Sequence, residues 1–216
     1  MIKDSTRQKA ADLTARYPAL APCRGDLEAA VEIICDGYRR GGKLLICGNG
    51  GSAADAEHIV GELMKGFLLP RKLGADFAAK FREHCPDCAD YFIENLQGAL
   101  PAVSLVDEIA LNTAFANDQA ADLSFAQQVL GMGKEGDVLL GISTSGNSKN
   151  VIYAVNLAKA LGLKTIALTG KSGGKLKAAA DVTVAAPAEE TYKIQEYHLP
   201  IYHMLCIAVE NEFFGE

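Results

Sequence analysis

A stretch rich in hydroxyl side chains lies at 143–148 of this 216-residue chain. It holds four hydroxyl side chains in six positions: Ser143, Thr144, Ser145 and Ser148. An apolar run precedes it and a helical pattern follows, so its backbone N–H groups should lie at a helix start, where unpaired donors and the helix dipole favour an anion. Because it contains no Lys or Arg, we expect neutral donors to hold a phosphate group there.

A second stretch, Gly48-Asn49-Gly50-Gly51-Ser52, also follows an apolar run. Ser52 is expected to cap a helix that begins at Ala53. Neither stretch is a Walker A motif or a dinucleotide-binding G-x-G-x-x-G motif. One such stretch alone would be an ordinary turn, because Ser and Gly are common in turns. Two of them at one edge of a sheet predict a ligand site.

Two pairs of side chains offer acid–base or metal chemistry. His58 and Glu62 are four positions apart and share a face of the helix that follows the second stretch. Gln195 and His203 are eight positions apart and share a face of the last helix after about two turns. A solvated helix face is the alternative for the first pair, and a subunit interface for the second. Both pairs contain donor types that bind zinc or transfer protons.

Two further motifs carry less chemistry. Asn117 and Asp118 follow the second predicted strand by one helix and become candidates for that reason, although both residue types also suit a helix end. His84-Cys85-Pro86-Asp87-Cys88 offers three metal ligands, whereas a structural zinc takes four. It also lacks the preceding strand of a thioredoxin-like redox site, so a turn between two helices is the favoured interpretation.

The elements that position these residues alternate between strands and helices. Short apolar runs predict five strands, at 43–47, 101–106, 136–142, 164–169 and 181–185. Their alternation with helices predicts a three-layer, doubly wound α/β sandwich around a parallel sheet. In such a sheet the ligand lies at the carboxyl ends of the strands, where both Ser/Gly stretches fall. Residues 1–42 are predicted to be an N-terminal helical extension and 68–97 a helical insertion within one domain, 1–216.

Composition limits the classes of partner. The net charge is -6 and charged residues make up 22%, which argues against general binding of nucleic acid. No apolar run reaches the roughly 18 residues that span a membrane, and the N-terminal segment lacks the apolar core of a secretory signal. The six cysteines are expected to be reduced. These features predict a cytoplasmic protein that binds a small molecule.

Together the motifs resemble the sugar isomerase (SIS) domain and, within it, the phosphoheptose isomerases. The matching stretches are 47–58 with Glu62, 116–118, 136–148, 168–170 and 194–198 with His203. The resemblance implies the five-stranded SIS fold and a homotetramer whose sites combine residues of neighbouring subunits. It also implies conversion of D-sedoheptulose 7-phosphate into D-glycero-D-manno-heptose 7-phosphate, a precursor of nucleotide-activated heptose for surface glycans.

The resemblance further implies roles for single residues. The phosphate would be held by Ser52, Ser143, Thr144, Ser145 and Ser148. The sugar would be contacted by Asn49, Gly50, Gly51, Asn117 and Asp118, with Glu62 and Gln195. One zinc ion would be bound by His58, Glu62, Gln195 and His203, while Glu62 and His203 also match the acid–base pair.

These roles compete for the same side chains. An aldose–ketose conversion moves a proton between neighbouring carbons through an enediol, which needs a base and a group that serves the oxygens. Zinc would instead polarise the carbonyl and hydroxyl groups as a Lewis acid. Three alternatives stay open: an isomerase of another sugar phosphate, a non-catalytic SIS module that senses a sugar phosphate or binds a partner, and a zinc- or redox-regulated protein that uses Cys85 and Cys88. The presence of both Glu62 and His203 favours an enzyme.

Overall fold

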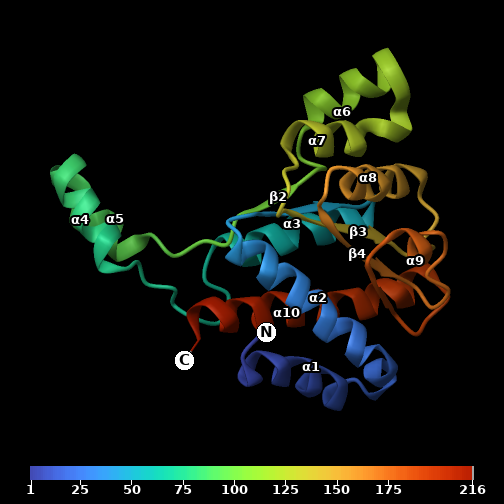
Figure 1. The fold of residues 1–216 in the computed structure, drawn as a ribbon, viewed down its shortest axis with the longest axis horizontal. Coiled ribbons are helices and arrows are strands. Elements are labelled where there is room, and N and C mark those ends of the chain that lie inside the picture. The colour runs from blue at the N-terminus through green and yellow to red at the C-terminus, as the bar shows by residue number, and fades with distance from the viewer. Residues whose placement is uncertain (216) are drawn as a thin grey trace.

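The computed structural model describes residues 1–215, and a single five-stranded sheet lies at its centre (Figure 1). The strands are β1 Leu44–Cys47, β2 Ala102–Ser104, β3 Val138–Ser143, β4 Lys164–Thr169 and β5 Val182–Ala185. All neighbours pair in parallel, in the order β2-β1-β3-β4-β5. The predicted strands and the parallel α/β class are confirmed. From β1 the chain adds β2 on one side and β3 to β5 on the other, so the topological switch point lies between β1 and β3. Ligand crevices form at such switch points.

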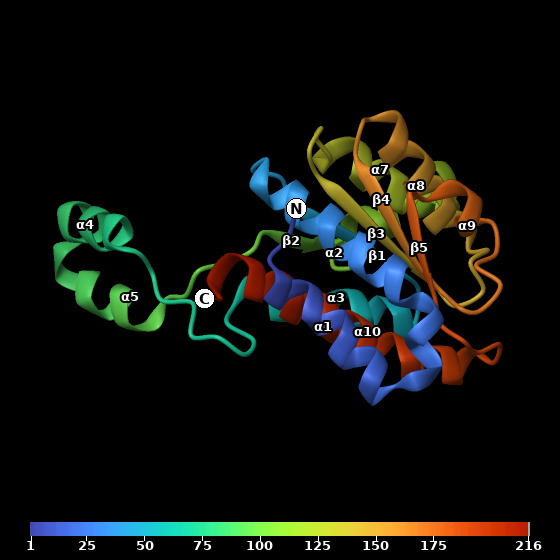
Figure 2. The same cartoon turned by 60° about the horizontal axis from the view of Figure 1, so that its bottom comes forward.

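Helices cover both faces of the sheet. They are α1 Asp4–Arg16, α2 Arg24–Arg39, α3 Gly51–Met64, α4 Ala75–His84, α5 Ala89–Asn95, α6 Ile109–Phe115, α7 Ser124–Met132, α8 Lys149–Ala160, α9 Leu176–Ala179 and α10 Thr191–Phe214. Helices α2, α3 and α10 lie on one face, and α7, α8 and α9 on the other (Figure 2). Helix α1 packs outside α10. Within the predicted extension 1–42, therefore, α2 covers the sheet itself.

Alternating strand residues feed two separate apolar cores. Leu44, Ile46 and Leu140 belong to the core beneath α2, α3 and α10, whereas Leu45 and Leu139 belong to the core beneath α7 and α8. This follows from the two-residue period of a strand, whose side chains point to opposite faces. Because both faces are covered, β1 and β3 are buried along their whole length. A rigid central sheet results, from which the loops at its carboxyl edge project.

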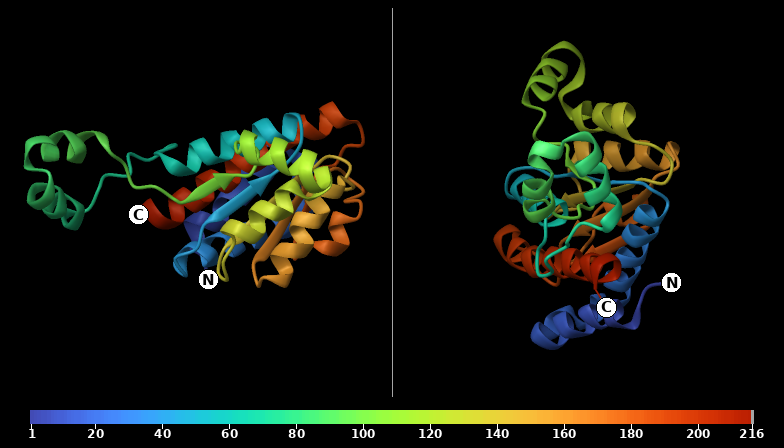
Figure 3. Two further views of the ribbon diagram at one scale, coloured as in Figure 1. Left: turned by 90° about the horizontal axis from the view of Figure 1, so that it is seen from above. Right: turned by 90° about the vertical axis from the view of Figure 1, so that its left-hand side faces the viewer.

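Residues 72–97 form a projecting hairpin of α4 and α5, which we call the arm (Figures 1 and 3). Phe81 of α4 packs against Phe92 of α5, with ring centroids 5.7 Å apart. Every residue of α4 is at least partly exposed. A single antiparallel bridge between Lys72 and Gln97 closes the base of the arm. Its tip holds the predicted turn between helices, where Cys85 and Cys88 are free thiols.

One local prediction, the cap at Ser52, differs from the structure. Helix α3 begins at Gly51 after Gly50, whose φ of 57° favours glycine, so Ser52 lies inside the first turn and is not the cap. Helix α10 continues through Pro200, which removes one N–H donor without ending the helix. Across residues 1–215, no helix combines the length and the apolar character needed to cross a membrane.

Candidate active site

The two Ser/Gly loops lie side by side at the carboxyl ends of β1 and β3, where the strand order reverses. The side-chain amides of Asn49 and Asn150 exchange two hydrogen bonds, of 3.0 and 2.8 Å. These bonds tie loop 48–52 to the first turn of α8, the helix that follows loop 143–148. The structure therefore places both loops at one crevice.

Loop 143–148 has the form of an anion site. The hydroxyl oxygens of Ser143 and Ser148 lie 2.9 Å apart, and Ser148 precedes α8 without capping it through its side chain. Gly146 has a φ of 65° and lies against the backbone of Gly173, where a Cβ atom would clash. Thr144 is half-buried and Ser145 is exposed. Hydroxyl groups and helix-start N–H groups thus lie together at a positive helix end.

An open pocket of about 610 Å³ borders this loop. It is lined by Thr144, Ser145, Asn147, Gly170, Lys171, Ser172, Ala188, Glu189 and Ile194. Lys171 is a cation that the sequence analysis did not single out; its Nζ lies 3.3 Å from the carboxylate of Glu189. The sequence could have indicated Lys171, because it follows the predicted strand 164–169 and so lies at the same edge of the sheet.

A cluster of titratable side chains forms where α3 meets α10. His58 Nε2 lies 3.2 Å from Glu62 Oε1, and the rings of His58 and His203 have centroids 5.1 Å apart. The hydroxyl of Tyr202 lies 2.9 Å from His58 Nδ1, and the Nζ of Lys65 donates to Glu62 at 3.0 Å. We call His58, Glu62 and His203 the acid–base cluster.

Burial shifts pKa values in and beside this cluster. Nε2 of His203 is buried and has no hydrogen-bond partner among the described residues. Burial, reinforced by His58, lowers the pKa of His203, which favours a neutral imidazole. Burial also raises the pKa of Asp55, beside Tyr202, to about 6. The cluster therefore combines a carboxylate with a neutral ring nitrogen, a pairing suited to proton transfer or to metal binding.

Three of the candidate residues lie away from this cluster. The amide of Gln195 lies against Gly51, and Gln195 is eight positions from His203 along α10, a rise of roughly 12 Å. Asn117 and Asp118 are exposed in a helical turn after α6 and hydrogen-bond to each other at 2.8 Å. The α6–α7 lobe that carries them stands out from the sheet (Figure 1).

The fold and the paired loops define the class of protein, an SIS domain. Two family models described as SIS domain match residues 106–208 and 19–83. The chain is 35% identical to a phosphoheptose isomerase of Akkermansia muciniphila, over 99% of this chain and 100% of that one. It is 39% identical to one of Geobacter sp. strain M21, over 99% and 96%.

Solved structures agree with these matches. The phosphoheptose isomerase of Francisella tularensis gives a TM-score of 0.74 at 31% identity and covers 93% of each chain. The chain belongs to the phosphoheptose isomerase family, and it is an enzyme of the isomerase class. These full-length relatives favour catalysis over the non-catalytic module.

Proposed function

We propose that the protein converts D-sedoheptulose 7-phosphate into D-glycero-D-manno-heptose 7-phosphate, a step that supplies heptose for surface glycans. The observation that carries this proposal is the meeting of Glu62 and His203, which two helices bring together beside His58. The names of the full-length relatives support the substrate. All six cysteines within the described residues are free thiols, which agrees with a reducing, cytoplasmic location.

The proton chemistry follows from the two side chains. Glu62 removes the proton from the carbon next to the carbonyl group, which gives an enediol, and returns it to the neighbouring carbon. His203, kept neutral by burial, moves a proton between the two oxygens. The hydroxyl groups of Ser143, Thr144, Ser145 and Ser148, with Ser52, hold the phosphate end. Asn49, Gly50 and Gly51 flank the sugar.

Zinc is the proposed metal, with His58, Glu62 and His203 as ligands and Gln195 of a neighbouring subunit as the fourth. The unpartnered Nε2 of His203 beside the His58–Glu62 pair supports a metal at this point. Two imidazoles and a carboxylate are donors that zinc accepts. When bound, zinc would polarise the substrate oxygens as a Lewis acid. Within residues 1–215, no group of three or more His, Cys, Asp or Glu side chains is already arranged to hold a metal ion.

The proposed active site is shared between subunits of a homotetramer. Along α3, Glu62 lies roughly 15 Å beyond Ser52 at 1.5 Å per residue. The substrate from C2 to phosphorus is about 9 Å long when extended, given bonds of about 1.5 Å. The substrate is therefore too short to join Ser52 to Glu62 within one chain. This supports a site that joins the phosphate loop, residues 143–148, and Gln195 of one subunit to the acid–base cluster of another. His203 also lines a groove of about 430 Å³ between α1 and α10, where Leu199 offers exposed apolar surface.

Turnover by purified wild-type protein tests the function. Sedoheptulose 7-phosphate and several six-carbon ketose phosphates are assayed, with metal analysis of the same preparation. We expect turnover of the seven-carbon substrate and its loss in Glu62→Gln, whereas Glu57→Gln, an exposed acid on the same helix, remains active. Tight binding without turnover would favour the sensing module, and full activity after metal stripping would exclude the role of zinc.

Subunit complementation tests the shared site. Glu62→Gln protein and a Ser143→Ala/Ser148→Ala variant are each expected to be inactive. After they are dissociated and reassembled together, mixed oligomers should regain activity, because some sites combine an intact loop with an intact cluster. Light scattering should give four times the chain mass. Mixed oligomers that stay inactive would place each site within one chain.

A further inference from the structure

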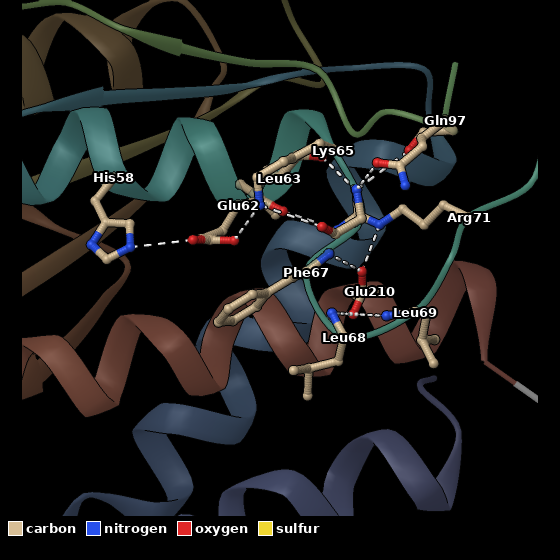
Figure 4. Close-up of polar contacts among 12 residues, drawn as sticks. His58, Glu62, Leu63, Lys65, Phe67, Leu68, Leu69, Arg71, Gln97 and Glu210 are labelled. Atoms are coloured by element: carbon tan, nitrogen blue, oxygen red, sulfur yellow. Dashed lines mark hydrogen bonds and ion pairs between the residues drawn. The ribbon is translucent and has the colours of Figure 1, made fainter. Parts of the chain in front are cut away.

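A buried ion pair lies outside the acid–base cluster and contacts the helix that carries it. Arg71 is 2% exposed and Glu210, on α10, is 1% exposed. Nε of Arg71 donates to Oε1 of Glu210 at 2.7 Å (Figure 4). Because desolvation offsets most of the attraction in such a pair, stability alone is a weak reason for its presence. The other hydrogen bonds of Arg71 and Glu210 indicate that the pair holds nearby backbone in place.

Glu210 fastens the loop that follows α3. Its carboxylate accepts hydrogen bonds from the backbone N–H groups of Phe67, Leu68 and Leu69, at 2.7, 2.8 and 3.1 Å. Burial by itself would raise the pKa of Glu210, but these donors and Arg71 outweigh it and lower that pKa. The carboxylate therefore stays ionised, with the loop wrapped around it.

Arg71 fastens the end of α3 itself. Its guanidinium donates to the backbone oxygen of Leu63 at 2.6 Å and to that of Glu62 at 3.0 Å. These are carbonyl groups of the last helical turn, which have no partner within the helix and which a cation stabilises. Figure 4 shows Arg71 between Glu210 and this turn. The backbone of the proposed base is thus held by a residue nine positions away.

The backbone of Arg71 is strained in order to make these contacts. Its φ is 31°, and it is the one non-glycine residue with positive φ within the described part of the chain. Such a conformation is unfavourable for a residue with a side chain and persists only where the surroundings impose it. The ring of Phe214, whose centroid lies 5.0 Å from Cζ, covers the guanidinium. The backbone conformation and the buried guanidinium together hold Arg71 in one conformation.

We propose that Arg71, paired with Glu210, is a positioning residue for the acid–base cluster. It fixes the backbone of Glu62 and, through the loop held on Glu210, the ring of Phe67, whose centroid lies 5.5 Å from that of His203. One ion pair thereby positions both Glu62 and His203, the proposed acid–base pair. This inference rests on the proposed function of Glu62 and His203.

The test compares Arg71→Ala with wild type in steady-state isomerisation, at a temperature where circular dichroism shows both proteins folded. We expect kcat to fall roughly 10- to 100-fold, because a displacement of about 1 Å has that effect, while KM changes little. The primary deuterium isotope effect on kcat should rise, since proton abstraction becomes slower relative to other steps. Added guanidinium ion should restore part of kcat by filling the vacated position.

The matched control is Val155→Ala, a fully buried residue on α8 in the opposite core. It should lose thermal stability yet keep kcat and the isotope effect of wild type. If Arg71→Ala behaves like this control, Arg71 is only structural and the inference is overturned. If Arg71→Ala does not fold, Glu210→Gln, which keeps the side-chain shape, is judged by the same readouts. Full activity of Glu62→Gln would instead contradict the proposed function itself.

Discussion

The phosphate loop and the acid–base cluster are built in different ways. In loop 143–148, the serine hydroxyl groups bond to residues two to five positions away, as between Ser143 and Ser148. In the cluster, the bond between His58 and Tyr202 spans 144 positions, and the Arg71–Glu210 pair that supports it spans 139. The proposed phosphate binding is thus encoded locally, whereas the proposed chemical step depends on how two helices pack. Substitutions should separate the two functions.

The largest expected effect is that of His203→Gln. Loss of an acid–base group lowers kcat roughly 10²- to 10⁴-fold, while KM stays close to that of wild type because the phosphate loop is intact. Steady-state kinetics with sedoheptulose 7-phosphate measures both constants. His84→Gln, an exposed histidine in the arm, is the control and should leave both unchanged. An unaltered kcat in His203→Gln would remove this residue from the chemistry.

Ser148→Ala should have the opposite pattern. Loss of one hydrogen bond to a charged phosphate is worth about 1.5–3 kcal/mol, or roughly 10- to 100-fold in KM, with a smaller change in kcat. Inhibition by inorganic phosphate should weaken in parallel. Ser5→Ala, at the far N-terminus, is the control. A fall in kcat at constant KM would show that the loop and the cluster are not separable.

His198 lies on α10 between Gln195 and His203 and predicts a pH dependence of stability. Its buried ring hydrogen-bonds to the backbone oxygen of Thr169 at 3.1 Å, and burial lowers its pKa to about 4. The unfolded chain takes up this proton below about pH 6.5, whereas the folded protein does so only near pH 4. Stability from this group is therefore complete above pH 6.5 and is lost between pH 6.5 and 4, by at most roughly 3 kcal/mol.

Urea unfolding across this pH range measures the effect. His198→Gln should flatten the dependence of the unfolding free energy on pH, and His84→Gln should leave it unchanged. An equal slope in His198→Gln and wild type would mean that other groups cause it.

The smallest effect is expected in the arm. Cys85→Ser with Cys88→Ser should change neither isomerase activity nor metal content, because the arm projects from the body that carries both regions (Figure 3). Metal analysis and kinetics on one preparation suffice. A loss of either property would restore the zinc- or redox-regulated alternative.

Local patterns predicted much of this molecule. The five strands and both Ser/Gly loops follow from short apolar runs and turn residues, so the crevice at β1 and β3 could be foreseen. The predicted cap at Ser52 is wrong, because Gly50 takes a backbone conformation that starts α3 earlier. Periodicity placed Gln195 and His203 on one face but did not show that Gln195 lies at the start of α3 and His203 beside His58, in the middle of α3.

The Arg71–Glu210 pair was missed for a different reason. Its partners are 139 positions apart, and no local pattern connects a loop arginine with a carboxylate on α10. One signal was present: Glu210 continues the face of Tyr202 and Cys206, two residues that turn out to be buried. A charged residue on an apolar helix face calls for a buried partner.

The narrow base of the arm has a practical consequence. Lys72 and Gln97 are direct neighbours, so the chain leaves and re-enters the body at almost the same point. The entropy of closing such a loop grows slowly with its length, which makes this point tolerant of exchange. A fluorescent or affinity module grafted between these residues would leave the central sheet undisturbed.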